Sequence, residues 1–390
     1  MDIKRLRADT PGVEHVLHLN SCGAGLMPRS VLAALTGHLT LEAEIGGYEA
    51  AERAADAIEH SYDAIARLLN CRREEIAVVE NATVGWDMAF YGMRLEPGDK
   101  VLTAVSEYAS NAIAYLQRAR HSGIEVVVVP NDEHGQLDVQ ALETLIDDRV
   151  KLISVTHVPT NGGLINPAAE IGRIARGAGI PYLLDACQSA GQLPLDVEVL
   201  GCDMLSATGR KYLRGPRGTG FLYVRESMLD RLEPPFLDLH SASWTASDGF
   251  EMRPDARRFE NWENYVAGKI GLGVAVDYAC DLGLDAIAAR IQLLAGLLRD
   301  GLSGLPGVTV RDLGQEKSGI VSFSVDGHEP TAVKSAMAAH GINISTTGVT
   351  STRYDMAERG LDQMNRLGVH YYNTEDEVDR FLARLSALLR

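Results

Sequence analysis

Residues 180–191, IPYLLDACQSAG, and residues 203–220, DMLSATGRKYLRGPRGTG, each place a charged side chain at the end of an apolar run. Asp185 ends the first run, and Lys211 shortly follows the second. Charges at the ends of buried strands are seldom there for stability, because burying them costs solvation free energy. We therefore interpret Asp185 and Lys211 as parts of one functional site at one edge of a sheet.

The chain around these two runs alternates short β-rich segments with helical patterns from about residue 75 onward. Near-continuous apolar strands separated by helices predict a parallel sheet that is covered on both faces. Ligands of such sheets bind beyond the carboxyl ends of the strands. The residues expected at that edge are Glu80, Ser106, Thr156, Asp185 and Thr208.

The pattern changes after about residue 265, where two long helical stretches, 265–282 and 285–303, precede several short β-rich runs. A last helix is expected to begin at Thr374, because Thr374 and Glu377 have capping-box spacing. We predict an α/β large domain over residues 18–286 and a smaller α+β domain over residues 287–390. The N-terminal segment, residues 1–17, is expected to pack on the smaller domain.

Composition narrows the classes of function. The chain has 390 residues with 37 lysines and arginines against 53 acids, a net charge of −16 that disfavours nucleic acid as a partner. We also expect a cytoplasmic protein without membrane contact, because neither a signal peptide nor an apolar stretch of membrane-spanning length is visible. The scattered cysteines show no metal-ligand spacing, so no metal is expected; they are Cys22, Cys71, Cys187, Cys202 and Cys280.

The charges at the sheet edge suit pyridoxal 5′-phosphate (PLP). This cofactor requires a lysine that forms an imine (Schiff base), an acid that keeps the pyridine nitrogen protonated, an anion site, and a cation for the substrate carboxylate. Lys211 is the candidate lysine and Asp185 the candidate acid. Gln188 is expected to donate to the 3-oxygen of the ring. Taken alone, Lys211 is more typical of a solvated surface, and Asp185 of a helix N-cap, than of a cofactor site.

A phosphate site is predicted in the stretch VVENATVGWD, residues 78–87, where a strand is followed by the start of a helix. The exposed amides and the positive end of the helix dipole would attract an anion at Asn81, Ala82 and Thr83. Thr208 and Arg210 would complete the site from the strand before Lys211. Simple capping of the helix by Asn81 is the alternative.

Two loops are expected to border the cofactor ring. Tyr108, in SEYASN, would lie flat on the ring, although a loop tyrosine alone says little. Thr160 and Asn161, in HVPTNGG, would lie near the edge of the ring, and an ordinary polar turn is the alternative.

Four stretches, LLDACQSAG, TGRKYLRGPRGTGFLYV, HVPTNGGLINP and RLGVHYYNTEDEVDRF, resemble the aminotransferase class V group of fold-type I PLP enzymes. This group includes cysteine desulfurases, isopenicillin N epimerase and hercynylcysteine sulfoxide lyase. The resemblance spans almost the whole chain and implies a large domain with a mostly parallel, seven-stranded type of sheet. It also implies the cofactor roles given above and assigns the substrate α-carboxylate to Arg366.

The same resemblance implies a homodimer with active sites at the interface. The segment RRFENWEN, residues 257–264, lies where the neighbouring subunit usually reaches the phosphate. The threonine that is typical of the group is absent there, so Asn261 or Trp262 would make the contact.

One departure from the group concerns the reaction. Desulfurases that pass on sulfur carry a cysteine before the position of Arg366, whereas residues 341–365, GINISTTGVTSTRYDMAERGLDQMN, contain none. Cys22 and Cys187 fall near the expected site, and Cys187 is interpreted as a small buried residue. A persulfide relay from the segment before Arg366 is therefore not expected.

The first hypothesis is a C–S lyase that acts on a cysteine derivative by abstraction of the Cα proton and β-elimination. Lys211 would act as the base. Arg353 is a candidate second cation for a substrate with a distal anionic group, and a solvated loop arginine is the alternative. A class V aminotransferase, an amino-acid epimerase and an idle PLP-binding relative remain the other hypotheses.

Overall fold

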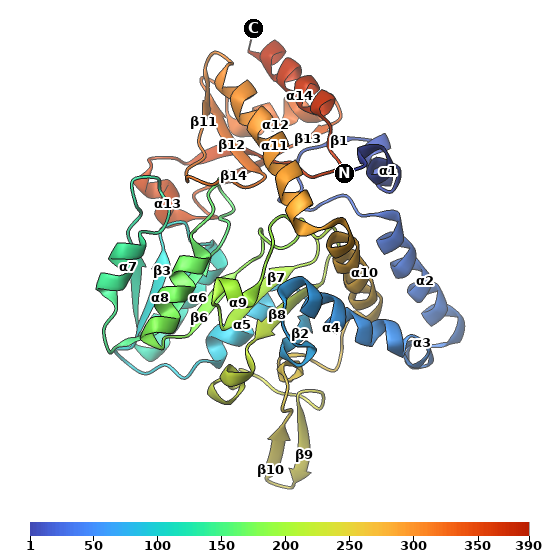
Figure 1. Cartoon of the computed structure of the whole chain (residues 1–390), viewed down its shortest axis with the longest axis vertical. Helices are drawn as coiled ribbons and strands as arrows, with labels where there is room; N and C mark the ends of the chain where they lie inside the picture. Colours follow the sequence, from blue (N-terminus) through green and yellow to red (C-terminus); the bar gives the residue numbers. More distant parts are fainter. Residues whose placement is uncertain (390) are drawn as a thin grey trace.

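The computed structural model describes residues 1–389 and contains two main β-sheets (Figure 1). The larger sheet has seven strands in the order β2-β8-β7-β6-β5-β3-β4. Its strands are β2 (Ile76–Val79), β3 (Lys100–Ala104), β4 (Glu125–Val129), β5 (Val150–Thr156), β6 (Tyr182–Asp185), β7 (Met204–Thr208) and β8 (Gly220–Val224). The alternation of strands and helices expected from about residue 75 onward is confirmed. The sheet is mixed, because β8 runs antiparallel to both of its neighbours, β2 and β7.

The apolar runs are continuous because both faces of the large sheet are buried. Consecutive side chains of a strand point to opposite faces. Leu183 of β6 accordingly joins one hydrophobic cluster and Leu184 joins another, and Met204 and Leu205 of β7 divide in the same way. A parallel strand that is covered on both sides needs apolar residues at successive positions, which removes the alternation of a half-exposed strand.

Helices cover the large sheet and extend from it (Figure 1). Within α8, Ile171, Ile174 and Ala175 are buried at helical spacing, and the helix ends at Gly179, whose φ of 68° suits glycine. The helical stretch 47–69 is divided into two helices, because the backbone at Ala54 leaves helical geometry. The helices of this part are α2 (Arg29–Ile45), α3 (Gly47–Arg53), α4 (Ala55–Leu69), α5 (Ala82–Gly92), α6 (Ala109–Ser122), α7 (Val139–Leu145), α8 (Ala168–Ala178), α9 (Val197–Leu200) and α10 (Val266–Leu282).

The C-terminal part contains a four-stranded antiparallel sheet in the order β11-β12-β15-β14. Thr374 and Glu377 form the predicted capping box at the start of the last helix. The elements are α11 (Leu284–Ser303), β11 (Val308–Val310), β12 (Ile320–Val325), α12 (Pro330–Ala338), β13 (Ile342–Asn343), β14 (Ser345–Gly348), α13 (Arg353–Glu358), β15 (Gln363–Gly368) and α14 (Glu375–Leu388). A large domain with a mixed seven-stranded sheet and a C-terminal α+β domain are therefore present, and we retain the division at 286/287 as a proposal.

The N-terminal segment lies against the C-terminal part. After α1 (Ile3–Ala8), the short strand β1 (Leu17–His18) pairs in parallel with β13. Arg7 donates from Nη1 to Glu377 Oε1 at 2.9 Å. A hairpin of β9 (Ala242–Ala246) and β10 (Gly249–Met252) protrudes at the opposite end of the molecule (Figure 1). Within residues 1–389, no helix combines the length and apolar character needed to cross a membrane.

Candidate active site

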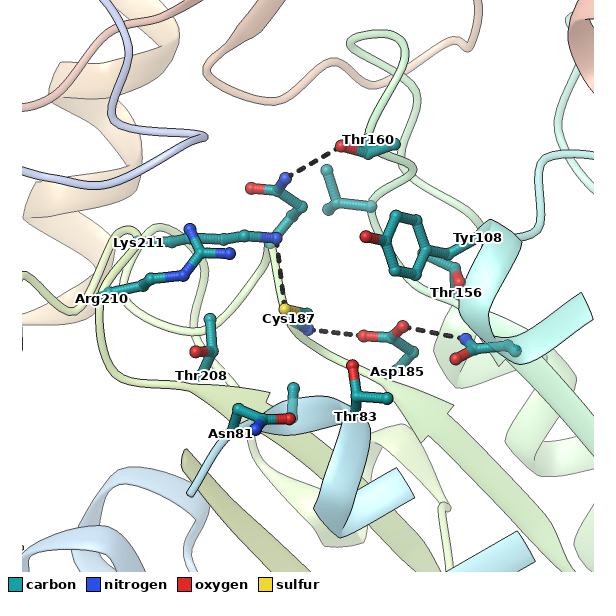
Figure 2. Close-up of a pocket in the computed structure, with 14 residues that line it drawn as sticks. Asn81, Thr83, Tyr108, Thr156, Thr160, Asp185, Cys187, Thr208, Arg210 and Lys211 are labelled. Atoms are coloured by element: carbon teal, nitrogen blue, oxygen red, sulfur yellow. Dashed lines mark hydrogen bonds between the residues drawn. The ribbon is translucent and has the colours of Figure 1, made fainter. Parts of the chain in front are cut away.

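A cavity of about 170 Å³ lies beyond the carboxyl ends of the parallel strands (Figure 2). Among the expected strand-end residues, Thr156, Asp185 and Thr208 line it. Nearly all of the predicted cofactor residues share this cavity, although they are distant in the sequence. The complete lining is Asn81, Ala82, Thr83, Tyr108, Asn111, Thr156, Val158, Thr160, Asp185, Cys187, Gln188, Thr208, Arg210 and Lys211.

Asp185 is the last residue of β6, and its side chain is buried. Its two carboxylate oxygens have different partners: Oδ1 accepts from the Cys187 amide at 2.9 Å, and Oδ2 accepts from Asn111 Nδ2 at 3.0 Å. Burial raises the pKa of Asp185, while these hydrogen bonds and the charge of Lys211 oppose the rise. The residues after Asp185 form turns and no helix begins there, so the N-cap alternative is wrong.

Lys211 enters the cavity from the loop after β7 (Figure 2). Its side chain is buried, which excludes the alternative of a solvated surface lysine. The Nζ atom lies 3.2 Å from Cys187 Sγ. Cys187 is half-buried and also lines the cavity, and burial raises the pKa of its thiol. The thiol form is therefore favoured, as for a packing residue.

The predicted phosphate end of the cavity lies at the first turn of α5. Asn81 caps this helix by accepting from the Val84 amide at 3.0 Å. Capping does not exclude anion binding, because the first turn of a helix presents several amides that have no partner within the helix. Thr83 is exposed, and Thr208 and Arg210 border the same cavity from the β7 side. The site thus combines amide, hydroxyl and guanidinium donors.

Tyr108 is half-buried at the start of α6 and approaches the cavity from the side opposite Lys211 (Figure 2). Gln188 has its amide nitrogen bound to the Cys22 carbonyl at 3.1 Å and to Thr160 Oγ1 at 3.3 Å. The Oε1 atom of Gln188 is buried and has no partner among residues 1–389. A hydroxyl group of a ligand would supply that missing partner.

Thr160 lines the cavity, but the neighbouring Asn161 does not. The side chain of Asn161 donates to the Gly348 carbonyl at 3.1 Å and to Thr352 Oγ1 at 2.6 Å. It therefore ties the loop after β5 to the segment before α13. The sequence predicted that Asn161 lies near the edge of the ring. In the structure its side chain lies outside the cavity, at the contact with the C-terminal part.

Arg366 lies on β15 and reaches the rim of the cavity through Thr160. Its Nη1 donates to Thr160 Oγ1 at 2.6 Å and to the Thr160 carbonyl at 3.0 Å, and its Nε donates to Ser345 Oγ at 3.1 Å. Arg353 is exposed at the start of α13 and does not line the cavity. The structure thus brings Arg366, but not Arg353, into contact with the residues of the site.

Two polar residues near Asp185 were not singled out from the sequence. Asn111 lines the cavity, and Glu107 lies fully buried behind it, where burial raises its pKa to about 7. The sequence contains a pattern that could have identified them. Glu107 follows a strand, and Asn111 stands four residues later, a spacing that brings side chains together on a helix. Val158 is a further lining residue that the sequence did not indicate, whereas Thr156 was expected at this edge without an assigned role.

The aminotransferase class-V family model matches residues 17–381 of the chain. The chain belongs to this family. A probable cysteine desulfurase of Synechocystis sp. is 31% identical over 385 residues, covering 96% of this chain and 91% of the relative. The cysteine desulfurase of Thermococcus onnurineus has a similar structure, with a TM-score of 0.92, 28% identity and coverage of 99% and 97% of the two chains.

The family assignment makes this protein a PLP-dependent enzyme with a fold-type I structure. A second solved neighbour is the cystine C–S lyase C-DES in complex with its reaction product, cysteine persulfide. It has a TM-score of 0.87 and 25% identity, with coverage of 97% of this chain and 99% of that chain. Both desulfurases and a C–S lyase are therefore among the proteins that this class V enzyme resembles.

The cavity fits PLP in the chemistry of its donor set. It offers a buried carboxylate at Asp185, a buried amine at Lys211, and anion donors at the start of α5. The amide group of Gln188, which also lines the cavity, adds a donor for an oxygen of the ring. These groups correspond to the ring nitrogen, the aldehyde, the phosphate and the 3-hydroxyl of the cofactor.

Proposed function

We propose that this protein is a C–S lyase that removes a thiol from the β-carbon of a cysteine derivative. The observation that carries the proposal is that the segment between β13 and β15, which contacts the loop after β5 and the start of α6, contains no cysteine. Asn161 binds Gly348 and Thr352 of this segment, and Ala109 N donates to the Ser351 carbonyl at 2.9 Å. The absence of a cysteine from this segment supports a reaction that does not pass sulfur to a thiol there.

Three residues of the chain would hold the cofactor and the substrate and move the proton. Asp185 would hold the ring nitrogen of the cofactor, and Lys211 would hold the aldehyde carbon and later accept the Cα proton of the substrate. Arg366 would bind the substrate carboxylate, since its guanidinium already lies at the rim with Thr160. When bound, PLP supplies an electron sink for the carbanion at Cα.

The cofactor would be held through its phosphate by the amides at Ala82 and Thr83 together with Thr208 and Arg210, and Tyr108 would cover one face of the ring. Gln188 would contact the 3-oxygen. Its amide nitrogen would exchange the longer of its two contacts, to Thr160 Oγ1 at 3.3 Å, for the 3-oxygen, which keeps the donor role predicted from the sequence.

The lyase reaction balances without a second amino acid. A cysteine conjugate and one water yield a thiol, pyruvate and ammonia, with the Cα proton transferred to Lys211 and the electron pair of the C–S bond leaving with sulfur. A desulfurase would instead transfer sulfur to a protein thiol and release alanine. An aminotransferase would require a 2-oxo acid, and an epimerase a second base on the opposite face of the ring.

Product analysis tests this proposal. The purified holoprotein is incubated with L-cysteine, cystine, S-alkyl cysteines and ordinary amino acids, with Lys211→Ala as the inactive control. Pyruvate and an equal amount of the leaving sulfur compound, formed without an added 2-oxo acid, support the lyase; that compound is sulfide from L-cysteine, a persulfide from cystine and a thiol from an S-alkyl cysteine. Alanine formed from cysteine would overturn it in favour of a desulfurase, and pyridoxamine phosphate that a 2-oxo acid converts back would establish an aminotransferase.

We further propose that the protein is a homodimer. The hairpin β9–β10 and the segment after it expose large apolar side chains, including Trp244 at 82%, Phe250 at 57% and Trp262 at 51%. Exposed apolar surface of this kind is typical of a protein interface. Asn261 and Trp262 remain our two candidates for the contact with the phosphate of the second subunit. Light scattering on the eluted protein should give twice the mass of 42.2 kDa, and Trp244→Glu should shift the protein toward the monomer.

A further inference from the structure

Behind Asp185 lies a second buried carboxylate, Glu107, and the amide of Asn111 connects the two. Asn111 Nδ2 donates to Asp185 Oδ2 at 3.0 Å and to Glu107 Oε1 at 2.9 Å. All three side chains are at most 5% exposed. Because an NH₂ group has two hydrogens, this arrangement uses its full donor capacity.

Glu107 is itself fixed from several elements. Oε1 also accepts from the Tyr108 amide at 2.7 Å and from the Thr156 hydroxyl of β5, and Oε2 accepts from the Thr103 hydroxyl of β3 at 2.8 Å. Tyr115 of α6 lies at the outer limit of contact with Oε2, at 3.5 Å. The carboxylate is thus held by two strands and by the first turns of α6.

We propose that Asn111 and Glu107 are positioning residues, in which Glu107 anchors Asn111 and Asn111 holds the Asp185 carboxylate so that it keeps the cofactor ring nitrogen protonated. The proposal extends the role of Asp185 given above and rests on it. Asn111 leaves lone pairs free on both oxygens of Asp185, since each oxygen has accepted a single hydrogen bond. Its donated hydrogen bond also favours the ionised form of Asp185, which a pyridinium requires as its partner.

Glu107 can hold Asn111 whether or not its carboxyl group is ionised. Asn111, Tyr108 and Thr156 all donate to Oε1, so a proton would reside on Oε2 and point toward a hydroxyl group. A glutamine at this position can present the same arrangement, with its oxygen in place of Oε1 and its NH₂ group in place of a protonated Oε2. Conservative replacement should therefore preserve the function, whereas truncation should not.

The experiment loads the protein with [¹⁵N]pyridoxal phosphate and records the ¹⁵N chemical shift of the ring nitrogen, which separates the protonated from the neutral ring. In Asn111→Ala the Asp185 carboxylate gains proton affinity, so we expect the signal to move toward the neutral value. We also expect the cofactor dissociation constant to rise roughly tenfold, the effect of losing one buried hydrogen bond to a charged group. Glu107→Ala should behave like Asn111→Ala, and Glu107→Gln should resemble the wild type.

Asn365→Ala is the matched control, because Asn365 is equally buried and donates to the Pro330 carbonyl in the C-terminal part. The change removes a buried hydrogen bond outside the large sheet, so it should leave the nitrogen signal unchanged even where stability falls. A wild-type signal in Asn111→Ala, or a loss in Glu107→Gln as large as in Glu107→Ala, overturns the proposal. If Asn111→Ala does not fold, the two Glu107 variants decide it. A neutral nitrogen in the wild type would instead refute the role of Asp185.

Discussion

The two ends of the active site are constructed differently. At the Asp185 end, the charged group is buried in the large sheet and held by Asn111 and a backbone amide. At the Arg366 end, the charged group is half-buried on the smaller sheet and is held by Thr160 and Ser345. One end is thus fixed by the large sheet and the helix α6 beside it, while the other depends on a contact between the two parts of the chain.

This difference indicates a division of labour between cofactor and substrate. A buried, hydrogen-bonded group keeps one geometry and one charge state, which suits a cofactor that stays bound. A half-buried guanidinium that donates to a threonine hydroxyl can exchange that partner for a carboxylate at little cost. We therefore expect changes at the Asp185 end to affect the state of the cofactor, and changes at the Arg366 end to affect the binding of substrate.

The largest effect is expected at Lys211, because it would both hold the cofactor and accept the proton of the substrate. Lys211→Ala should lower kcat by at least about 10³-fold, because it removes the proposed base together with the amine that holds the cofactor. Borohydride should no longer fix the cofactor to the chain, which mass spectrometry of the reduced protein can measure. Lys317→Ala, a change on the C-terminal part, is the control. Full activity of Lys211→Ala would disprove the assignment of the base.

Arg366→Ala tests the substrate end and should have the next largest effect. Loss of a charge-assisted, bidentate contact should raise KM about 10²-fold, while cofactor affinity and absorption stay close to wild type. Arg353→Ala should change KM much less, because Arg353 is exposed and does not line the cavity. Weaker cofactor binding in Arg366→Ala would contradict the division between the two ends.

Cys187→Ala should have a small effect, within about threefold on kcat/KM. The thiol contacts Lys211, yet burial raises its pKa and keeps it poorly suited to accept sulfur. Steady-state kinetics with a cysteine conjugate measure the change, and Cys280→Ala, which lies outside the cavity, is the matched control. A complete loss of turnover in Cys187→Ala would indicate that this cysteine takes part in sulfur transfer.

The sequence predicted the Asp185 end better than the contacts around it. Asp185, Thr208 and Lys211 follow apolar runs, and the end of a buried strand fixes where such residues lie. The neighbours Thr160 and Asn161 show the limit: both stand in one loop, and only packing against residues 348–352 decides which of them faces the cavity. Likewise, the contact between Arg366 and Thr160 joins residues 206 positions apart, which no local pattern reveals.

The last prediction concerns the pH dependence of stability at the Asp185 end. Burial raises the pKa of Glu107 from 4.5 to about 7, so the folded protein retains a proton that the unfolded chain releases. Stability from this group is therefore present at low pH and is lost as the pH rises from about 4.5 through 7. Glu107→Gln has no such proton, so from pH 5 to pH 8 its stability should improve relative to wild type by about 1–3 kcal/mol.

Urea unfolding of the cofactor-free proteins measures this difference in stability. Glu59→Gln is the control, since Arg257 lowers the pKa of Glu59 and keeps it ionised over that range. If the unfolding free energies of Glu107→Gln and wild type differ by the same amount at both pH values, Glu107 is already ionised at pH 5. Its hydrogen-bond donors, which favour the ionised form, would then outweigh the effect of burial on its pKa.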